Sequence, residues 1–194
     1  MDIDYLHVSA FTKVPGEGNS AAVCELQSWP RDEVLASVAR RIALPVTSFL
    51  MRGARDVELR WFSRAGTPVA SMCGHGTLAA SYAVALSQPD QSRFSFRTPG
   101  GVVDVQREGE LFRLALPRWE CKPVETPTEL AEALRRTPEE ILDAGRDLIA
   151  RYATEAEVRG LSPDMPKLLA LGRRGFIATA PGIEFDCVSR FFCP

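Results

Sequence analysis

The spacing of apolar side chains in the first part of the chain predicts a strand-rich domain with two helices. Val57, Leu59 and Trp61 alternate with polar residues, which is typical of a strand with one buried face. Alternation, or a short apolar run bounded by turn residues, predicts further strands at residues 3–11, 21–26, 47–51, 93–98, 102–107 and 111–116. Residues 31–42 instead carry apolar side chains at helical spacing, and Pro45 prevents that helix from continuing.

Residues 77–86 are apolar on nearly every face that a helix would present. A helix without a polar face has to be buried on all sides. In a small strand-rich domain this predicts a sheet that curls around a central helix. A strand of a parallel sheet is the alternative, and the length and alanine content of the segment favour the helix.

The pattern changes near Trp119, where a second domain is expected to begin. Thr126 and Thr137 each precede a proline and, three residues on, a glutamate, which is the pattern of a capping box at a helix start. Ser162 is expected to start a third short helix that Gly172 ends. Strands are predicted at residues 147–152, 175–180 and 185–191, and no internal repeat is evident. We therefore expect an α+β protein with domains at residues 1–118 and 119–194.

Composition and charge exclude several classes of function. The chain has 23 Lys and Arg residues against 25 Asp and Glu, and the basic residues are scattered. Nothing in this pattern indicates binding to nucleic acid or to an anionic membrane. No apolar run approaches the roughly 20 residues that span a bilayer, and the acidic N-terminus is unlike a secretory signal. We therefore expect a cytoplasmic protein with no nucleic-acid or membrane partner.

Cysteine and histidine usage narrows the chemistry further. The five cysteines are odd in number and include no Cys-x-x-Cys pair, which indicates reduced thiols and not a disulfide framework. Only two histidines occur, so a zinc site of the usual ligand spacing is not expected. The chain also has no Gly-x-Ser-x-Gly motif of a serine hydrolase. We therefore expect no bound metal.

The most informative candidate site is the motif Cys73-Gly74-His75-Gly76-Thr77, at the start of the apolar helix. Two glycines let a ligand approach the backbone, and the free N–H groups of a first helical turn attract carboxylate or phosphate. A thiol placed there is expected to have a lowered pKa, and the imidazole adds a proton carrier. The motif is equally consistent with a tight entry into the helix that has no function.

A second candidate is the run from Gly18 to Val23. Asn19 offers a donor and an acceptor at the mouth of a strand, although asparagine in a glycine turn is usually only turn chemistry. The three tryptophans, at positions 29, 61 and 119, fit packing roles better than stacking on a ligand.

Together, several segments resemble the PhzF-like isomerases of phenazine biosynthesis, which are relatives of diaminopimelate epimerase. They are Ala-Phe-Thr at 10–12, Gly-Asn-Ser-Ala-Ala-Val at 18–23, Leu-Arg-Trp-Phe-Ser at 59–63, Cys-Gly-His-Gly-Thr-Leu-Ala-Ala at 73–80 and Ser-Arg-Phe-Phe-Cys-Pro at 189–194. The resemblance is strong through residue 98, thin between 119 and 174, and returns at the end.

The resemblance implies two similar domains, each a curved, mostly antiparallel sheet around a central helix, with the active site between them. Family members use no metal or organic cofactor. Helix N-termini hold substrate carboxylates, and a carboxyl side chain moves a proton between carbons. This implies an isomerase that moves a double bond in a small carboxylated metabolite, in secondary-metabolite or antibiotic biosynthesis. His75 would carry the proton, and the substrate would be bound by Asn19, Ser20, Gly74, Gly76 and Thr77.

Two departures from the family pattern bear on catalysis. The family commonly has a glutamate in a Leu-Ser-Glu-Thr-type segment, and the matching position in the expected substrate site is Val46. Valine cannot carry a proton, and loss of a positioned acid/base typically costs about 10²–10⁴ in rate. The family pattern also continues past the match at 189–194, so the second domain is expected to be incomplete in this chain.

Three functions stay open on this basis. The first is the isomerase that depends on His75. The second is a racemase or epimerase with Cys73 as its thiol base, and the third is a catalytically inactive binding or assembly homologue, which Val46 favours. The sequence leaves the substrate and the oligomeric state open, and the resemblance allows a homodimer.

Overall fold

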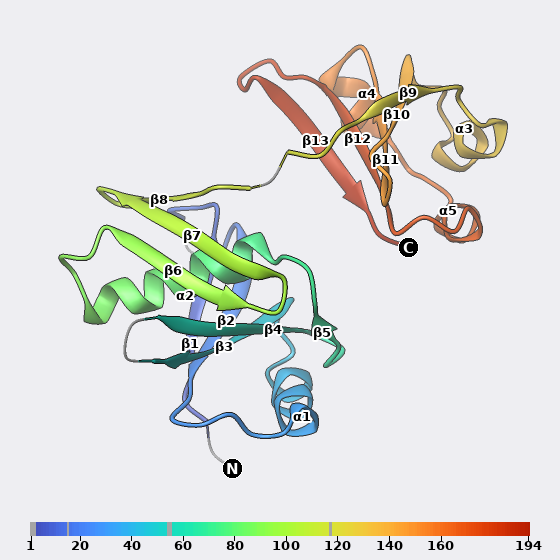
Figure 1. Cartoon of the computed structure of the whole chain (residues 1–194). Coiled ribbons are helices and arrows are strands. Elements are labelled where there is room, and N and C mark those ends of the chain that lie inside the picture. Colours follow the sequence, from blue (N-terminus) through green and yellow to red (C-terminus); the bar gives the residue numbers. More distant parts are fainter. Residues whose placement is uncertain (1–2, 15, 54–55, 117) are drawn as a thin grey trace. The chain divides into compact units, whose positions relative to one another are not determined.

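The computed structural model describes residues 3–14, 16–53, 56–116 and 118–194, and it divides into two compact units (Figure 1). Unit 1 is Met1–Leu116 and unit 2 is Pro117–Pro194, a division close to the predicted boundary. Both units combine strands and short helices, as the α+β expectation requires. No helix among the described residues has the length and apolar character needed to cross a membrane.

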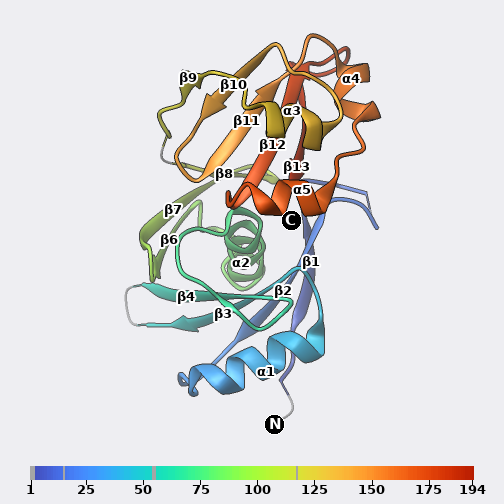
Figure 2. The ribbon, with the colours of Figure 1, turned by 90° about the vertical axis from the view of Figure 1, so that its right-hand side faces the viewer.

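Unit 1 is a curved, mostly antiparallel sheet around a central helix. Its strands are β1 (Leu6–Ala10), β2 (Asn19–Glu25), β3 (Val46–Arg52), β4 (Val57–Ser63), β5 (Pro68–Val69), β6 (Arg93–Thr98), β7 (Gly101–Glu108) and β8 (Leu111–Leu114). Its helices are α1 (Asp32–Ile42) and α2 (Gly74–Ser87). The strand order is β1-β2-β3-β4-β6-β7-β8, with β5 paired to β4, and only β2–β3 and β4–β6 are parallel. Figure 2 looks along α2 and shows these strands curled around it.

Small side chains let α2 lie close to the sheet. Ala79, Ala80 and Val84 are buried against a core that includes Trp61 and Phe96. Burying each such large apolar side chain stabilises the fold by about 1.5–3 kcal/mol. The central helix predicted at 77–86 is therefore confirmed, and it begins three residues earlier, at the motif itself.

The expected burial of α2 on all sides is only partly correct. Tyr82 and Leu86 are 44% and 57% exposed. The sheet curls without closing, because β1 and β8 are its two edges and do not pair with each other. One side of the central helix is therefore left uncovered by the sheet.

The convex face of the sheet is covered by α1. Alternation along β3 sends Leu50 into the core around α2 and Phe49 into a second core with Leu35 and Ala39 of α1. The two faces of β3 are thus both apolar, which explains why its segment shows no clear alternation in the sequence.

Unit 2 contains a smaller sheet and three short helices. Its strands are β9 (Lys122–Val124), β10 (Glu140–Asp143), β11 (Asp147–Arg151), β12 (Gly175–Pro181) and β13 (Cys187–Phe192), and its helices are α3 (Thr128–Leu134), α4 (Glu155–Gly160) and α5 (Met165–Ala170). The order is β13-β12-β11-β10-β9, with β11–β12 parallel. Strands β10 to β13 thus repeat the pairing pattern of β1 to β4, antiparallel, parallel across a helical connection, then antiparallel.

Three predicted helix starts in unit 2 are wrong or displaced. The expected helix after Thr137 is strand β10, because Glu139 and Glu140 form ion pairs with Arg151 of β11 at 2.7 and 2.9 Å and tertiary pairing overrides the local signal. Helix α3 is present but is capped by Pro127 and not by a Thr126 capping box. The third helix starts at Met165 and not at Ser162, because the side chain of its N-cap Asp164 accepts the Lys167 N–H.

Candidate active site

The predicted motif forms the N-terminus of α2. Cys73 is the N-cap, in extended conformation, and Gly74 is the first helical residue. The main-chain N–H and the hydroxyl of Thr77 both donate to the carbonyl oxygen of Cys73, at 2.9 and 2.7 Å. The two donors of Thr77 therefore close the first turn, and the expectation that its N–H would hold a carboxylate is wrong.

The two glycines of the motif have different environments. A side chain at Gly76 would place its Cβ 2.9 Å from Ser48 Oγ and from Trp61 Cδ1, so this glycine is required for packing. A Cβ at Gly74 would have only Leu114 Cδ2 within 4 Å, at an ordinary 3.7 Å. Packing therefore accounts for Gly76, whereas the space beside Gly74 is open apart from Leu114.

Cys73 is a neutral thiol beside the imidazole. Its Sγ lies 3.7 Å from His75 Nδ1. Burial raises the pKa of Cys73, and a hydrogen bond from the Gly76 N–H offsets this only in part. The expected lowering of the pKa at the helix N-terminus is thus wrong, because desolvation outweighs the helix amides.

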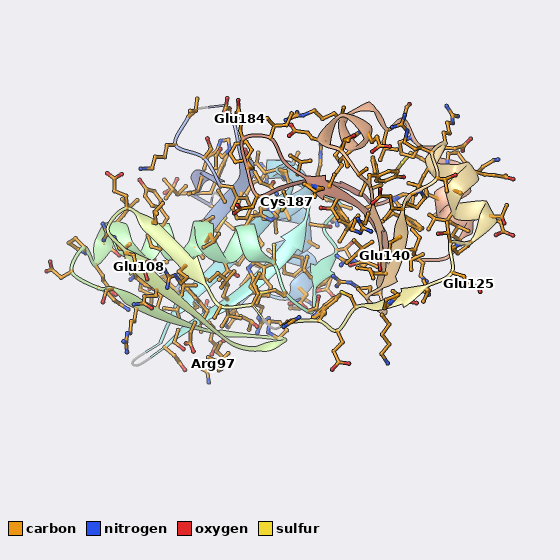
Figure 3. All side chains as sticks on the ribbon, turned by 90° about the horizontal axis from the view of Figure 1, so that it is seen from above. Arg97, Glu108, Glu125, Glu140, Glu184 and Cys187 are labelled. Carbon is orange, nitrogen blue, oxygen red and sulfur yellow. The ribbon has the colours of Figure 1, made fainter. Side chains whose placement is uncertain are left out.

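Alkylation should separate the five cysteines into two classes. Burial raises the pKa of Cys24 to about 12, and that of Cys73 is also raised, whereas Cys121, Cys187 (Figure 3) and Cys193 are exposed. Since the thiolate is the reactive form, iodoacetamide at pH 7.5 should label the exposed class first. Peptide mass spectrometry over time would measure this, and early labelling of Cys73 would contradict the assignment.

His75 is a half-buried imidazole with one nitrogen unsatisfied. Burial lowers its pKa, so the ring is neutral at pH 7. Nδ1 faces the Cys73 thiol, whereas Nε2 is buried and has no hydrogen-bond partner among the described residues. A buried polar atom without a partner is uncommon in native proteins and marks a site of interest. Neutral Nε2 can accept a proton from a ligand placed against it.

The free amides of the first turn are fewer than expected. The first N–H groups of a helix have no intrahelical partner. That of Gly76 points at the Cys73 thiol, which leaves the N–H groups of Gly74 and His75 without a partner in the part of the chain that the structure describes. These two amides, beside His75 Nε2, form the candidate anion site.

The remaining predicted residues lie at the starts of two neighbouring strands. Asn19 and Ser20 are half-buried at the start of β2, and Ser20 Oγ lies 3.4 Å from Ser9 Oγ. Val46 opens β3, pairs with Ala21 and is only 2% exposed. The structure thus brings Val46 into the core that contains Cys73, and it leaves Asn19 and Ser20 without a hydrogen bond to the motif.

Two residues near the motif were not predicted as site residues. Ser48 is fully buried and donates from its hydroxyl to the Gly76 carbonyl at 2.9 Å, which fixes α2 to β3. The sequence could have indicated this residue, because Ser48 is a hydroxyl residue within an apolar strand and a buried hydroxyl group needs a hydrogen-bond partner. Trp61 is 1% exposed, and its indole Nε1 has no partner among the described residues.

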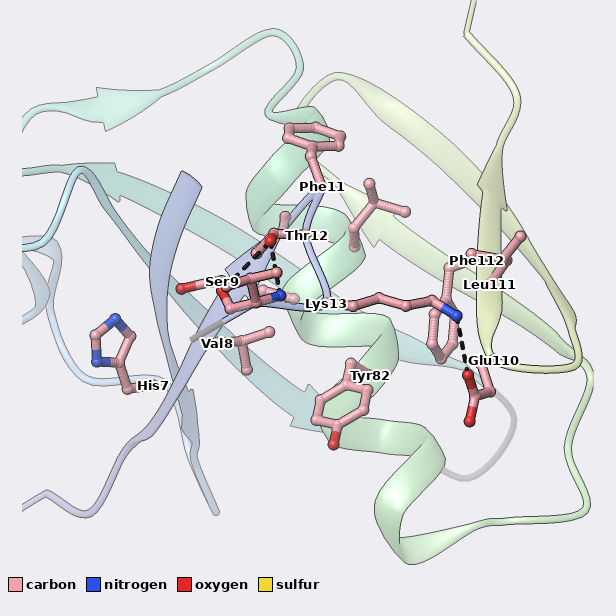
Figure 4. Close-up of a pocket in the computed structure, with 14 residues that line it drawn as sticks. His7, Val8, Ser9, Phe11, Thr12, Lys13, Tyr82, Glu110, Leu111 and Phe112 are labelled. Carbon is pink, nitrogen blue, oxygen red and sulfur yellow. Dashed lines mark hydrogen bonds and ion pairs between the residues drawn. The ribbon is translucent and has the colours of Figure 1, made fainter. Parts of the chain in front are cut away.

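A cavity of about 830 Å³ lies on the uncovered side of α2, between β1 and β8 (Figure 4). Its rims are joined by an ion pair of 3.1 Å between Lys13 and Glu110. Leu78, Ala79 and Tyr82 of α2 line it, whereas residues 73–77 do not. Within the described residues, no three His, Cys, Asp or Glu side chains gather as metal ligands.

Comparison with known proteins identifies relatives over the whole chain. Residues 8–194 match the model of the PhzC-PhzF family, described as phenazine biosynthesis-like protein. Two proteins of Pseudomonas aeruginosa, both named uncharacterized isomerases, are 36% and 34% identical, and each match covers 100% of this chain and 74% of the relative.

Solved structures agree with this relationship. A phenazine biosynthesis PhzC/PhzF protein from Clostridium difficile superimposes with a TM-score of 0.92 at 32% identity, covering 100% of this chain and 74% of the other. A predicted epimerase from Pseudomonas aeruginosa, at 18% identity and a TM-score of 0.66, shares the fold and covers 91% of this chain and 70% of the other. Sequence, fold and the motif at α2 therefore agree that the chain belongs to the phenazine biosynthesis-like (PhzF) family of isomerases.

Proposed function

We propose that the protein moves a proton between carbons of a small carboxylated metabolite, without a metal or organic cofactor, and so relocates a double bond. The observation that carries this proposal is the buried, unpartnered Nε2 of neutral His75 beside the free amides of Gly74 and His75. A base and an anion site are thus adjacent at one helix terminus. The family description supports a role in secondary metabolism.

The chemistry needs only these groups. His75 Nε2 removes a proton from the carbon next to the carboxyl group, and the electron pair spreads into the carboxyl and the neighbouring double bond. The amides of Gly74 and His75 stabilise the negative charge that develops on oxygen. The imidazolium then returns the proton to the far end of the system, so the product is an isomer and His75 is again neutral.

Deuterium incorporation tests this function without knowledge of the substrate. The native chain is incubated in D₂O with a panel of unsaturated carboxylic acids and a bacterial metabolite extract. We expect at least one carboxylic acid to gain a single deuterium, detected by mass spectrometry, together with an isomer of the same composition. If no carboxylic acid gains deuterium above a heat-inactivated sample, the isomerase proposal fails.

An epimerase with Cys73 as base is the second candidate, and its support is the distance of 3.7 Å between Sγ and His75 Nδ1. The raised pKa of Cys73 weighs against it, because a neutral thiol has to lose its proton before it can act. Deuterium at an α-carbon of unchanged connectivity, lost in Cys73→Ala, would favour the epimerase.

A binding protein that has lost its chemistry is the third candidate, supported by Val46. Val46→Glu places a carboxyl group at a position that is 2% exposed, in the core around α2. Because a buried carboxylate without a partner is costly, we expect the free energy of unfolding to fall by about 3 kcal/mol. If the site at the start of α2 is a retired active site, the same variant should create deuterium incorporation that the native chain lacks.

Val46→Gln is the matched control for that variant, since it has the same shape without an ionisable proton. Denaturant unfolding compares the stability of the two, and the D₂O assay compares their chemistry. If the native chain itself incorporates deuterium into a carboxylic acid, the proposal of a binding protein without catalytic activity is contradicted.

A further inference from the structure

The indole N–H of Trp61 is a second unsatisfied group at the start of α2. Trp61 lies on β4 and is 1% exposed, and its Nε1 has no hydrogen-bond partner among the described residues. The ring itself packs in the core around α2, which explains a large apolar side chain at this position but not its N–H. An unpaired buried donor destabilises a folded protein, so the unpaired N–H of Trp61 needs a physical explanation.

The five-membered ring of the indole packs against the first turn of the helix at its Cδ1 atom. Trp61 Cδ1, the ring atom bonded to Nε1, lies 2.9 Å from the point where a Cβ on Gly76 would sit. Ser48 Oγ lies at the same distance from that point, but it donates to the Gly76 carbonyl and forms no hydrogen bond with the indole. The unpaired N–H, on the atom bonded to Cδ1, therefore lies close to the first turn, in which the amides of Gly74 and His75 are free.

The first turn of α2 holds donors and no negatively charged side chain. The first turn of α2 contains no acidic residue. Cys73 is held as a neutral thiol and His75 as a neutral ring, both by burial. The two free backbone amides and the nearby indole N–H are therefore donors in a turn that has no anion of its own, and an oxygen anion is the kind of ligand that satisfies such donors.

Trp29 provides a contrast within the same unit. Its Nε1 donates to Glu58 Oε2 at 2.7 Å, and its ring stacks under the guanidinium of Arg60 at 4.1 Å. The indole N–H of Trp29 is therefore used by the fold, whereas that of Trp61 is not.

We propose that Trp61 is a specificity-determining residue whose indole N–H donates to a carboxylate oxygen of the substrate at the first turn of α2. The inference rests on the proposed function, because it adds a side-chain donor to the anion site beside His75. A carboxylate accepts this hydrogen bond in addition to those from the backbone, whereas a neutral carboxamide of the same shape accepts it more weakly.

Indole ¹⁵N–¹H spectra test the contact directly. The chain has three tryptophans, and Trp61→Phe assigns the signal of interest by its disappearance. Benzoate, crotonate and inorganic phosphate are titrated to saturation, with benzamide and crotonamide as neutral matches. We expect at least one anion to shift the Trp61 indole signal, its neutral match to shift it less, and the Trp29 signal to stay unchanged.

Matched phenylalanine variants separate binding from structure. Trp61→Phe keeps an aromatic side chain and removes the unpaired N–H, but the smaller ring leaves a cavity in the core, so we expect a lower melting temperature together with anion binding weakened about tenfold or more. Trp29→Phe removes a paired N–H, so we expect a lower melting temperature and unchanged binding. A purely structural Trp61 would give a lower melting temperature and no change in binding, which overturns the proposal.

The backbone amides of Gly74 and His75 are followed in the same titrations. If they shift and the Trp61 indole does not, the Trp61 assignment fails and the anion site of the proposed function stands. If the indole shifts but the native chain incorporates no deuterium, the isomerase fails and Trp61 remains an anion donor. If no anion moves the indole signal, the inference is overturned.

Discussion

His75→Ala should lower deuterium incorporation in the D₂O assay by about 10²–10⁴ relative to the native chain. The imidazole is the ionisable group of the motif that can exchange a proton near neutral pH, since the pKa of Cys73 is raised and Val46 has no proton to give. Initial rates of deuterium uptake, measured on the native chain and the variant at equal concentration, give the ratio directly.

The chain contains its own control for this variant. His7, the other histidine, is exposed on β1 and lines the cavity between β1 and β8, away from residues 73–77. His7→Ala should keep the native rate. His75→Gln fills the space and still forms hydrogen bonds but cannot carry a proton, so it should be as slow as His75→Ala. Full turnover in either His75 variant would remove His75 as the proton carrier.

The pH dependence of the rate follows from the burial of His75. Because burial lowers its pKa from the ordinary value near 6.5, the neutral base persists below that pH. The acid limb of the rate profile should therefore lie below about pH 6.5 and be absent from His75→Gln.

Stability should change over the same pH range. Below about pH 6.5 the unfolded chain binds a proton at this histidine while the folded chain does not, so the free energy of unfolding falls as the pH drops toward the folded pKa. The contribution is fully present above the unfolded pKa. Urea unfolding of the native chain and of His75→Gln at pH 7.5 and 5.5 would isolate it.

The helical core of unit 1 could be predicted from the sequence because its signals are local. An apolar segment at 77–86 has only one way to avoid water, and the glycine-rich motif before it marks a helix start. The environment of that start could not be predicted. Side chains from β3 and β4 bury this turn, and the burial raises the pKa of Cys73 where a lowered pKa was expected. The hydrogen bonds of Thr77 to the Cys73 carbonyl occupy the donors that were expected to bind the substrate.

Unit 2 was harder to predict because its local signals compete. The pattern from Thr137 to Glu140 fits a capping box, yet pairing with β11 makes Glu140 the first residue of a strand. The capping box that the structure contains, Thr154 with Glu157, was not predicted. The repeat of β1–β4 in β10–β13 is a repeat of connectivity that no local sequence pattern shows, although the resemblance implied two similar domains.

Gly76→Ala should lower the free energy of unfolding by about 1–3 kcal/mol. The new methyl group would meet Ser48 Oγ and Trp61 Cδ1 at 2.9 Å and Cys73 Sγ at 3.1 Å. Ser48 cannot move freely, because its hydroxyl holds the Gly76 carbonyl, and Trp61 is fixed in the core at 1% exposure. Replacing glycine by alanine gains at most about 1 kcal/mol in helix propensity. The energetic cost of overpacking is therefore larger than this gain.

Gly74→Ala, two residues earlier in the same turn, separates the cost of overpacking from the gain in helix propensity. Its Cβ would have only Leu114 Cδ2 within 4 Å, at 3.7 Å, so the propensity gain is not opposed, and stability should stay equal or rise by up to about 1 kcal/mol. Urea unfolding of both variants measures the difference. Equal stability of the two would mean that the first turn of α2 can shift away from β3 and β4, and the fixed placement of Trp61 and His75 around the anion site would then lose its basis.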